Sequence, residues 1–223
     1  MQSDIVITID GPAGAGKSTV AKRVAEQLGI IYIDTGAMYR ALTLKALRED
    51  IDLNNEDELA HLAHRTEIEL EKIDGEDKVL LDEEDVTEEI RSQKVSNYVS
   101  VVAKVSSVRE ELVNLQQEMA SNKGVIMDGR DIGTVVLPDA DLKIFLTASV
   151  EERARRRYEE LKEKGKDVEF DELKDEILRR DRLDQERKVA PLKKAEDAIE
   201  LDSTNLTVEE VLRQVIKLCQ EEL

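Results

Sequence analysis

One motif near the start of the chain limits the possible folds more than any other feature. The run Gly11-Pro12-Ala13-Gly14-Ala15-Gly16-Lys17-Ser18-Thr19 matches the phosphate-binding pattern G-x-x-x-x-G-K-[ST]. It follows the apolar, β-branched run 5–10, typical of a buried strand, and precedes 20–28, whose apolar residues recur at helical spacing. A glycine-rich turn between a strand and a helix is the context this pattern requires, so the sequence predicts an α/β fold built around a nucleotide site.

Each part of this motif suits a nucleoside triphosphate. Glycines allow backbone angles that a β-carbon forbids, and the backbone N–H groups, with the positive end of the following helix, then attract phosphate. Lys17 can reach the outer phosphates, and the hydroxyl of Ser18 can ligate Mg²⁺. The motif predicts phosphate binding but does not reveal what is done with the phosphate.

Composition and charge exclude several classes of protein. A length of 223 residues fits one large domain, or a core with an inserted subdomain. The formal net charge of −18 argues against nucleic acid or an anionic membrane as a partner. Cys219 is the only cysteine, so neither a disulfide framework nor a cysteine metal site is expected. Because the chain shows neither an apolar leader nor a long apolar span, we expect a cytoplasmic protein, and we expect it to be a monomer.

Beyond the motif, apolar runs alternate with segments of helical spacing. Further strands are predicted at 30–34, 125–128, 142–147 and 198–202. Helices are predicted from Thr35, at 56–65, at 95–120 with Lys123-Gly124 as its end, at 149–163, at 170–187, and from the capping box Thr207–Glu210 to the C terminus. This order predicts a doubly wound, mainly parallel sheet flanked by helices.

A predicted hairpin interrupts the alternation of strands and helices. The alternating runs 68–73 and 78–82 flank Asp74-Gly75, a strong turn signal. We therefore expect an inserted subdomain at 65–95, whose acidic surface is most simply a solvated face.

A second departure is a charged helix–break–helix segment at 149–190, broken at Lys164-Gly165-Lys166. Its many arginines either pair with neighbouring Glu and Asp or belong to a mobile lid that closes on transferring phosphates. With a lid at 149–190 and the insert removed, the core comprises 1–64, 96–148 and 191–223.

Charged residues also gather at predicted strand and helix ends. The strand 125–128 ends in Asp128, where an acid can support Mg²⁺ directly or through water. The segment 128–134 adds Arg130 and Asp131 at the edge where open α/β sheets bind ligands, although a plain Asp-Gly turn is the alternative. Arg40 lies near a helix N-terminus, where either an incoming anion or simple surface exposure explains it.

With these motifs the chain resembles the bacterial-type cytidylate kinases, members of the P-loop nucleoside monophosphate kinases. The resemblance covers essentially the whole chain. The matching segments are ITIDGPAGAGKST at 7–19, DTGAMYR at 34–40, IRSQ at 90–93, VSNYVSVVAKVSSVRE at 95–110, DGRDIGTVV at 128–136, ERARRR at 152–157 and RRDRLDQERKVAPL at 179–192. The first is shared with many NTPases, whereas the 95–110, 128–136 and 179–192 segments are more specific.

The resemblance implies phosphoryl transfer from ATP to CMP or dCMP, with Mg²⁺, in a P-loop NTPase-type fold that has an inserted monophosphate-binding subdomain and a helical lid. It places ATP at Gly11 to Thr19, with Arg153 and Arg157 on the ATP side. The residues that would hold the monophosphate are Thr35, Arg40, Ser100, Arg109, Arg130 and Asp131. Arg180, Asp184 and Arg187 would reach the acceptor's sugar and phosphates. Lys17, Arg130, Arg180 and Arg187 are the expected catalytic residues, and Ser18 and Asp128 the expected metal-site residues.

Three other classes of protein also contain a P-loop. A GTPase switch would need a base-reading Asn-Lys-x-Asp, and Asn122-Lys123-Gly124-Val125 lacks the aspartate. Another small-molecule kinase of the thymidylate, adenylate or shikimate type shares the P-loop and the lid. A catalytically silent nucleotide-binding protein is a different class, disfavoured by Lys17 together with the lid arginines.

Overall fold

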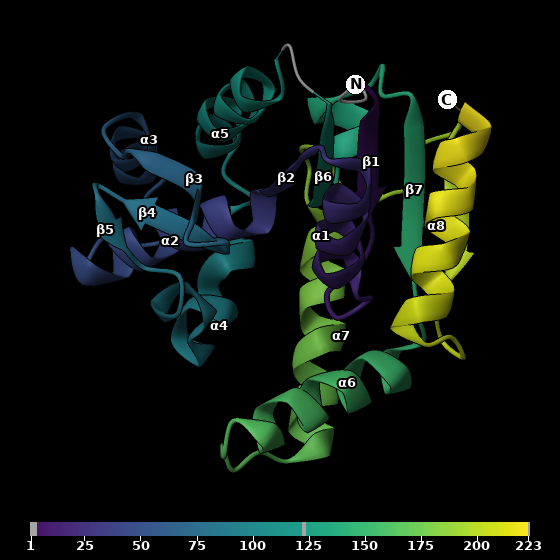
Figure 1. The fold of residues 1–223 in the computed structure, drawn as a ribbon. Coiled ribbons are helices and arrows are strands. Elements are labelled where there is room, and N and C mark those ends of the chain that lie inside the picture. The colour runs from purple at the N-terminus through teal and green to yellow at the C-terminus, as the bar shows by residue number, and fades with distance from the viewer. Residues whose placement is uncertain (1–3, 122–123, 223) are drawn as a thin grey trace. The chain divides into compact units, whose positions relative to one another are not determined.

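The computed structural model describes residues 4–121 and 124–222, so Asn122 and Lys123, used in the sequence arguments, lie outside the described residues. The chain divides into two compact units (Figure 1). Unit 1 comprises Met1–Ile33 and Ala120–Leu223, and unit 2 comprises Asp34–Met119. Each unit has its own apolar core. Unit 2 contains the expected insert at 65–95 but also includes helices on both sides of it.

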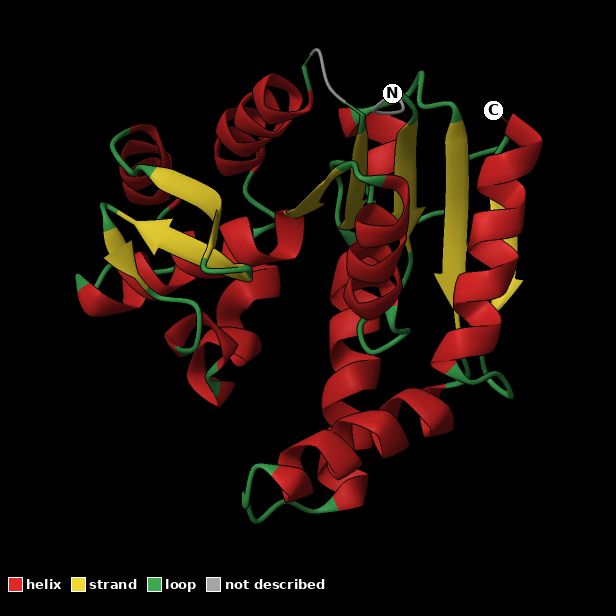
Figure 2. Cartoon of the chain, in the orientation of Figure 1, coloured by secondary structure: helices red, strands yellow, loops and turns green. Residues whose placement is uncertain are grey.

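A five-stranded sheet forms the centre of unit 1 (Figure 2). The strand order is β2 (Ile31–Asp34), β6 (Val125–Gly129), β1 (Val6–Asp10), β7 (Leu142–Thr147) and β8 (Ile199–Asp202). The strand β1 pairs in parallel with both β6 and β7, and β7 pairs in parallel with β8. This confirms the predicted α/β fold with a central parallel sheet.

Helices α1 (Lys17–Leu28) and α8 (Val208–Glu222) bury their apolar sides in the same core as β1 and β7. The predicted capping box begins α8: Thr207 Oγ1 accepts from the N–H of Glu210 at 3.3 Å, and Glu210 Oε2 accepts from the N–H of Thr207 at 2.8 Å. On α8 the thiol of Cys219 is fully buried. Burial raises the pKa of this thiol to about 11.

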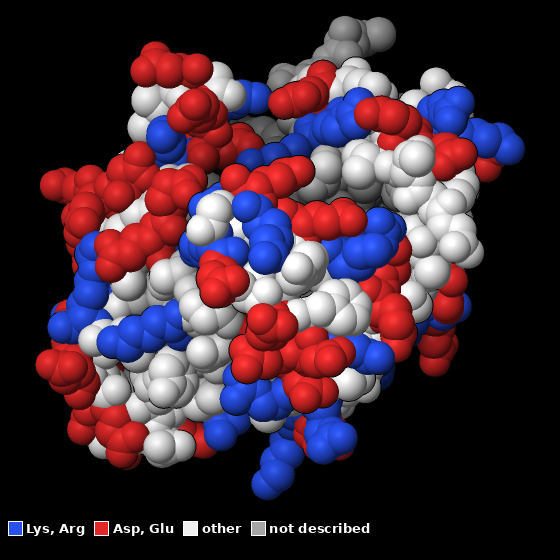
Figure 3. All heavy atoms as spheres, turned by 90° about the horizontal axis from the view of Figure 1, so that it is seen from below, with Lys and Arg blue, Asp and Glu red and all other residues white. Residues whose placement is uncertain are grey.

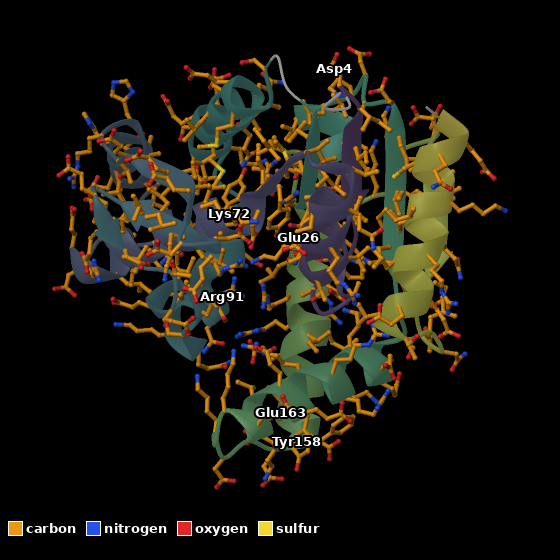
Figure 4. All side chains as sticks on the ribbon, viewed as in Figure 1. Asp4, Glu26, Lys72, Arg91, Tyr158 and Glu163 are labelled. Atoms are coloured by element: carbon orange, nitrogen blue, oxygen red, sulfur yellow. The ribbon has the colours of Figure 1, made fainter. Side chains whose placement is uncertain are left out.

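The predicted helix–break–helix segment is present as α6 (Val150–Glu163) and α7 (Phe170–Glu186). Gly165 takes a positive φ of 70° in the break, as expected for a glycine after a helix end. The rings of Tyr158 and Phe170 meet edge to face with centroids 6.2 Å apart, which pins the two helices together near the break. Figure 4 shows Tyr158 and Glu163 on α6. Mobility of this segment stays a prediction.

Unit 2 joins helices to a small antiparallel sheet. Its elements are α2 (Thr35–Arg48), α3 (Glu56–His64), β3 (Ile68–Ile73), β4 (Glu76–Leu81), β5 (Glu84–Asp85), η1 (Glu89–Arg91), α4 (Gln93–Val102) and α5 (Ser106–Ala120). The predicted hairpin is confirmed, with β3 and β4 antiparallel around Asp74 and Gly75. The short strand β5 was not predicted, and the helical region 95–120 consists of two helices. In the part of the chain that the structure describes, no helix is long and apolar enough to cross a membrane.

The P-loop needs glycine at position 11 for a steric reason. Gly11 has a φ of 148°, and a β-carbon there would lie 1.9 Å from the carbonyl oxygen of Leu146 on the neighbouring strand β7. Only a residue without a side chain lets β1 and β7 approach so closely at this point.

We predict that Gly11→Ala lowers the free energy of unfolding by about 3 kcal/mol or more, because the loop must move away from β7. The matched control is Gly165→Ala, since Gly165 also has positive φ but no atom within 4 Å of its added β-carbon. That variant should lose only about 1 kcal/mol, from backbone strain alone. Urea unfolding measures both losses, and equal values would contradict the steric account.

Candidate active site

The P-loop ends in a helix N-terminus that has no side-chain cap. Gly16 is the N-cap of α1 with a φ of 91°, and no acidic residue occupies the first turn. By contrast, Asp34, Ser92 and Ser149 each accept a backbone N–H at the starts of α2, α4 and α6. Uncapped N–H groups and the helix dipole favour an anion at the start of α1.

Lys17 lies at the first position of α1 and is 5% exposed. Its Nζ donates to the carbonyl oxygen of Pro12 at 2.9 Å, which folds the side chain back over the loop. Burial, with help from the nearby charge of Arg130, lowers the pKa of Lys17 to about 7. A phosphate arriving at the loop would favour the charged form of this amine.

Asp128, at the end of β6, has hydrogen-bond donors on both carboxylate oxygens. Ser18 Oγ donates to Oδ2 at 3.1 Å, and the hydroxyl of Tyr32 on β2 donates to Oδ1 at 2.8 Å. The structure thus brings together the two predicted metal-site residues, Ser18 and Asp128. Carboxylate and hydroxyl oxygens are hard donors of the kind Mg²⁺ prefers, so these residues fit that ion. Tyr32 was not predicted as a site residue, because only the strand order places it beside Asp128.

Asp10, at the end of β1, fixes the segment that follows β6. Its two carboxylate oxygens accept from the backbone N–H groups of Ile132 and Gly133, each at 2.8 Å. These residues begin η2 (Ile132–Val136), a single π-helical turn, a feature frequently found at functional sites. A β-carbon at Gly133 would lie 2.9 Å from Thr8 Oγ1, so glycine permits this close approach to β1. Neither the role of Asp10 nor the π-helical turn was predicted from the sequence.

A cluster of buried ion pairs joins the segment after β6 to α7. Arg130 Nε donates to Asp184 Oδ2 at 2.9 Å, and Arg187 Nη2 donates to Asp131 Oδ1 at 3.1 Å. Burial alone would raise the pKa of Asp184, but the charge and hydrogen bond of Arg130, with the charges of Arg180 and Arg187, hold it below its usual value. Within unit 1, the structure therefore gathers all three predicted catalytic arginines around two predicted substrate-binding carboxylates.

The arginines of α6 fall into two groups, one facing the P-loop and one facing neighbouring glutamates. Arg153, 3% exposed, donates to the carbonyl oxygens of Ala148 and Ala13 and to Asp181 Oδ2, so its guanidinium lies against the back of the P-loop. Arg157 is partly exposed and pairs with Glu160 at 2.8 Å. Arg155 pairs with Glu152 and Glu159 on the surface. Acidic and basic side chains lie side by side over the face drawn in Figure 3, as such local pairing produces.

Unit 2 contains four predicted acceptor residues. Thr35 opens α2 and is buried, and Arg40, one turn along, pairs with Asp34 at 3.2 Å. Ser100 on α4 is buried. Arg109 on α5 is 3% exposed and lies over the ring of Tyr39, with its guanidinium carbon 5.6 Å from the ring centroid. This contact links α5 to α2 and holds the guanidinium plane in place.

Comparison with known proteins gives one consistent answer. The family model described as "Cytidylate kinase" matches residues 7–221. The chain belongs to the cytidylate kinase family. A cytidylate kinase of Bacillus velezensis is 58% identical over 99% of this chain and 99% of its own length. Those of Bacillus pumilus, at 60% identity over 97% and 96%, and Bacillus subtilis, at 56% over 99% and 99%, are similar relatives. Membership makes the chain a kinase, with ATP as the co-substrate that the family implies and a small molecule as acceptor.

Solved structures support the fold of this cytidylate kinase family member independently. A shikimate kinase from Bacteroides thetaiotaomicron aligns with a TM-score of 0.50 at 16% identity, covering 97% of this chain and 98% of its own. An uncharacterized protein from Eubacterium ventriosum aligns with a TM-score of 0.53 at 14% identity, covering 98% and 99%. At such low identity the likeness shows the fold alone.

Asp10 generates a prediction about pH. Burial raises the pKa of this carboxyl to about 6, although the N–H groups of Gly133 and Ile132 oppose the shift. A carboxyl that holds its proton more tightly when folded stabilises the fold at low pH, and this contribution is lost as the pH rises through the folded pKa. Relative to Asp10→Asn, the wild type should therefore lose about 2 kcal/mol of unfolding free energy between pH 4 and pH 7.

Urea unfolding of both proteins at the two pH values measures this difference. The exposed Asp139 offers a matched control, Asp139→Asn, in the same part of unit 1. If the difference in unfolding free energy between wild type and Asp10→Asn stayed constant from pH 4 to pH 7, that result would contradict the raised pKa.

Proposed function

We propose that this chain transfers the γ-phosphoryl group of ATP to CMP and dCMP, giving ADP with CDP and dCDP. The observation that carries the proposal is the combination, within unit 1, of an uncapped P-loop containing buried Lys17 with the arginines Arg130, Arg180 and Arg187. Family membership names the acceptor base. Both substrates are polyanions, so the protein's main task is to cancel charge.

The chemistry needs no covalent enzyme intermediate. An oxygen of the acceptor phosphate attacks the γ-phosphorus, the bond to the bridging oxygen breaks, and ADP leaves with that electron pair. Lys17 and the three arginines stabilise the charge on the transferring group and hold the two anions in line. Because Arg130 and Arg187 already have carboxylate partners, they are oriented before substrate arrives.

Ser18 and Asp128 would hold Mg²⁺, and Tyr32 would keep the Asp128 carboxylate in one orientation. When bound, the ion neutralises charge on the phosphates of ATP.

On the ATP side, we assign phosphate binding to Gly11 through Thr19 and to Arg157, whose partly exposed side chain can exchange Glu160 for a phosphate. Arg153 would contribute through the P-loop backbone that it contacts rather than by reaching the phosphates.

On the acceptor side, we assign the monophosphate to Thr35, Arg40 and Arg130, and the sugar and phosphates to Arg180, Asp184 and Arg187. The residues proposed to read the base are Ser100, Arg109 and Asp131. Cytosine offers an amino donor, which suits a carboxylate, next to a ring nitrogen and a carbonyl, which suit a guanidinium. Uracil would present its carbonyl to the carboxylate and its N–H to a donor.

The segments 65–95 and 149–190 would serve as monophosphate-binding insert and lid, and the lid would exclude water that otherwise hydrolyses ATP. We propose a cytoplasmic monomer that does not bind nucleic acid, consistent with the net charge of −18.

The deciding experiment measures ADP release with CMP, dCMP, UMP, AMP and dTMP as acceptors. We expect turnover with CMP and dCMP to exceed the others, and Lys17→Met to lower kcat at least ~10²-fold because it deletes one preorganised charge. Circular dichroism checks that the variant is folded. Turnover with AMP or dTMP alone would point to another monophosphate kinase, and ADP binding without turnover of any acceptor to a silent nucleotide-binding protein. Near-normal kcat in folded Lys17→Met would remove the P-loop assignment.

Asp131 generates a specificity prediction. Asp131→Asn keeps the side-chain shape and its bond to Arg187, but can turn an amide donor toward the uracil carbonyl. We expect kcat/KM for CMP to fall and the preference for CMP over UMP to shrink, while KM for ATP changes little. Arg109 would still oppose uracil, so the preference should not reverse. Steady-state kinetics with both acceptors at saturating ATP measure the ratio, and an unchanged ratio would leave Asp131 a structural residue.

A further inference from the structure

Two arginines of α6 contact the P-loop from behind. Arg153 Nη1 donates to the carbonyl oxygen of Ala13 at 2.9 Å, and Arg156 Nη1 donates to that of Ala15 at 3.3 Å. The two arginines lie one turn apart on the same helix, and Figure 1 shows α6 near the start of α1. A β-carbon on Gly14 would lie 3.1 Å from Arg153 Cβ, so the loop rests directly on this helix.

Because the peptide group is planar, these contacts also fix the direction in which two backbone N–H groups of the P-loop point. All described peptide bonds are trans, so the carbonyl of one residue and the N–H of the next point to opposite sides. A guanidinium that holds the carbonyls of Ala13 and Ala15 toward α6 thereby directs the N–H groups of Gly14 and Gly16 away from it. Glycines can rotate freely, so a loop with three of them needs such anchors.

Arg156 is itself anchored on its other side. Its Nε donates to Glu152 Oε1 at 2.8 Å, and its guanidinium donates to the hydroxyl of Ser203 at 3.1 Å and to the carbonyl oxygen of Ser203 at 2.6 Å. Ser203 is 1% exposed and follows β8. The guanidinium therefore connects three segments, namely α6, the P-loop and the connection from β8 to α8.

We propose that Arg156, together with Arg153, is a positioning residue for ATP: the two guanidinium groups hold the P-loop carbonyls so that the N–H groups of Gly14 and Gly16 face the phosphates. The inference rests on the proposed function, because it requires the loop to bind the phosphates of ATP. A charged donor on a carbonyl also polarises the attached N–H, which makes it a stronger donor to an anion. Arg156 would act through the backbone and never touch the nucleotide.

The test compares Arg156→Met with Arg155→Met. Arg155 is the neighbouring residue on α6, but in the part of the chain that the structure describes its guanidinium bonds to Glu152 and Glu159 and not to the P-loop. It is therefore a matched control for charge and helix position. We expect Arg156→Met to raise the Kd for ADP and the KM for ATP about tenfold, the scale of one hydrogen bond from a charged group, with KM for CMP within twofold of wild type. Arg155→Met should bind ADP like the wild type, and Arg156→Lys should recover part of the loss.

A second measurement separates positioning from simple support of the fold. The backbone amide proton of Gly16, followed by NMR, should shift downfield when ADP is added to the wild type, and shift less in Arg156→Lys, which retains a charge and is the variant to use if Arg156→Met does not fold. A role limited to stability would lower Tm but leave the Kd for ADP and the Gly16 shift unchanged, and that result would overturn the proposal. If the wild type itself neither bound ADP nor phosphorylated CMP, the proposed function would fail instead.

Discussion

Paired charges removed from water hold the functional end of unit 1 together. The side chains of three arginine–carboxylate pairs are largely buried: Arg130–Asp184, Arg187–Asp131 and Arg153–Asp181. An isolated buried charge costs several kcal/mol, and removing one partner leaves the other uncompensated. An acidic chain can therefore concentrate cations at a phosphate site only by supplying carboxylates beside them. A phosphate bound as we propose would compete for guanidinium groups that are already in place, which would avoid reorganising them during the reaction.

The sheet imposes the second constraint on this site. The P-loop follows β1, Asp128 lies at the end of β6, and the segment with Arg130 and Asp131 follows β6. The two strands run parallel and end together. Asp10 then joins one strand end to the next by accepting two N–H groups, so the segment carrying Arg130 and Asp131 has one conformation. Burial destabilises the charged form of this carboxyl, which raises its pKa. The buried carboxylate thus holds Arg130 and Asp131 in place although its burial is unfavourable for folding at neutral pH.

Local patterns in the sequence were enough for much of the fold but not for the site's internal contacts. The P-loop, the hairpin at Asp74-Gly75 and the capping box of α8 each depend on residues a few positions apart, and all were predicted. The π-helical turn depends on Asp10, 122 residues earlier, and the bonds of Arg153 and Arg156 to the P-loop span 140 and 141 residues. The helical and strand periodicities of the sequence reflect only neighbours a few residues apart, so they cannot predict such contacts. The roles of Thr35, Arg40, Ser100 and Arg109 came from the family resemblance, and they stay predictions.

The state of Cys219 has a practical consequence for following motion in this molecule. Alkylating reagents attack the thiolate, and a side chain that is fully buried with a pKa near 11 offers almost none at neutral pH. The natural sequence has no other cysteine. A single cysteine introduced at an exposed position, for instance beside Gly165 between α6 and α7, would be the sole site of fluorophore attachment. Ligand-dependent movement of that segment could then be recorded by fluorescence without first removing the native thiol.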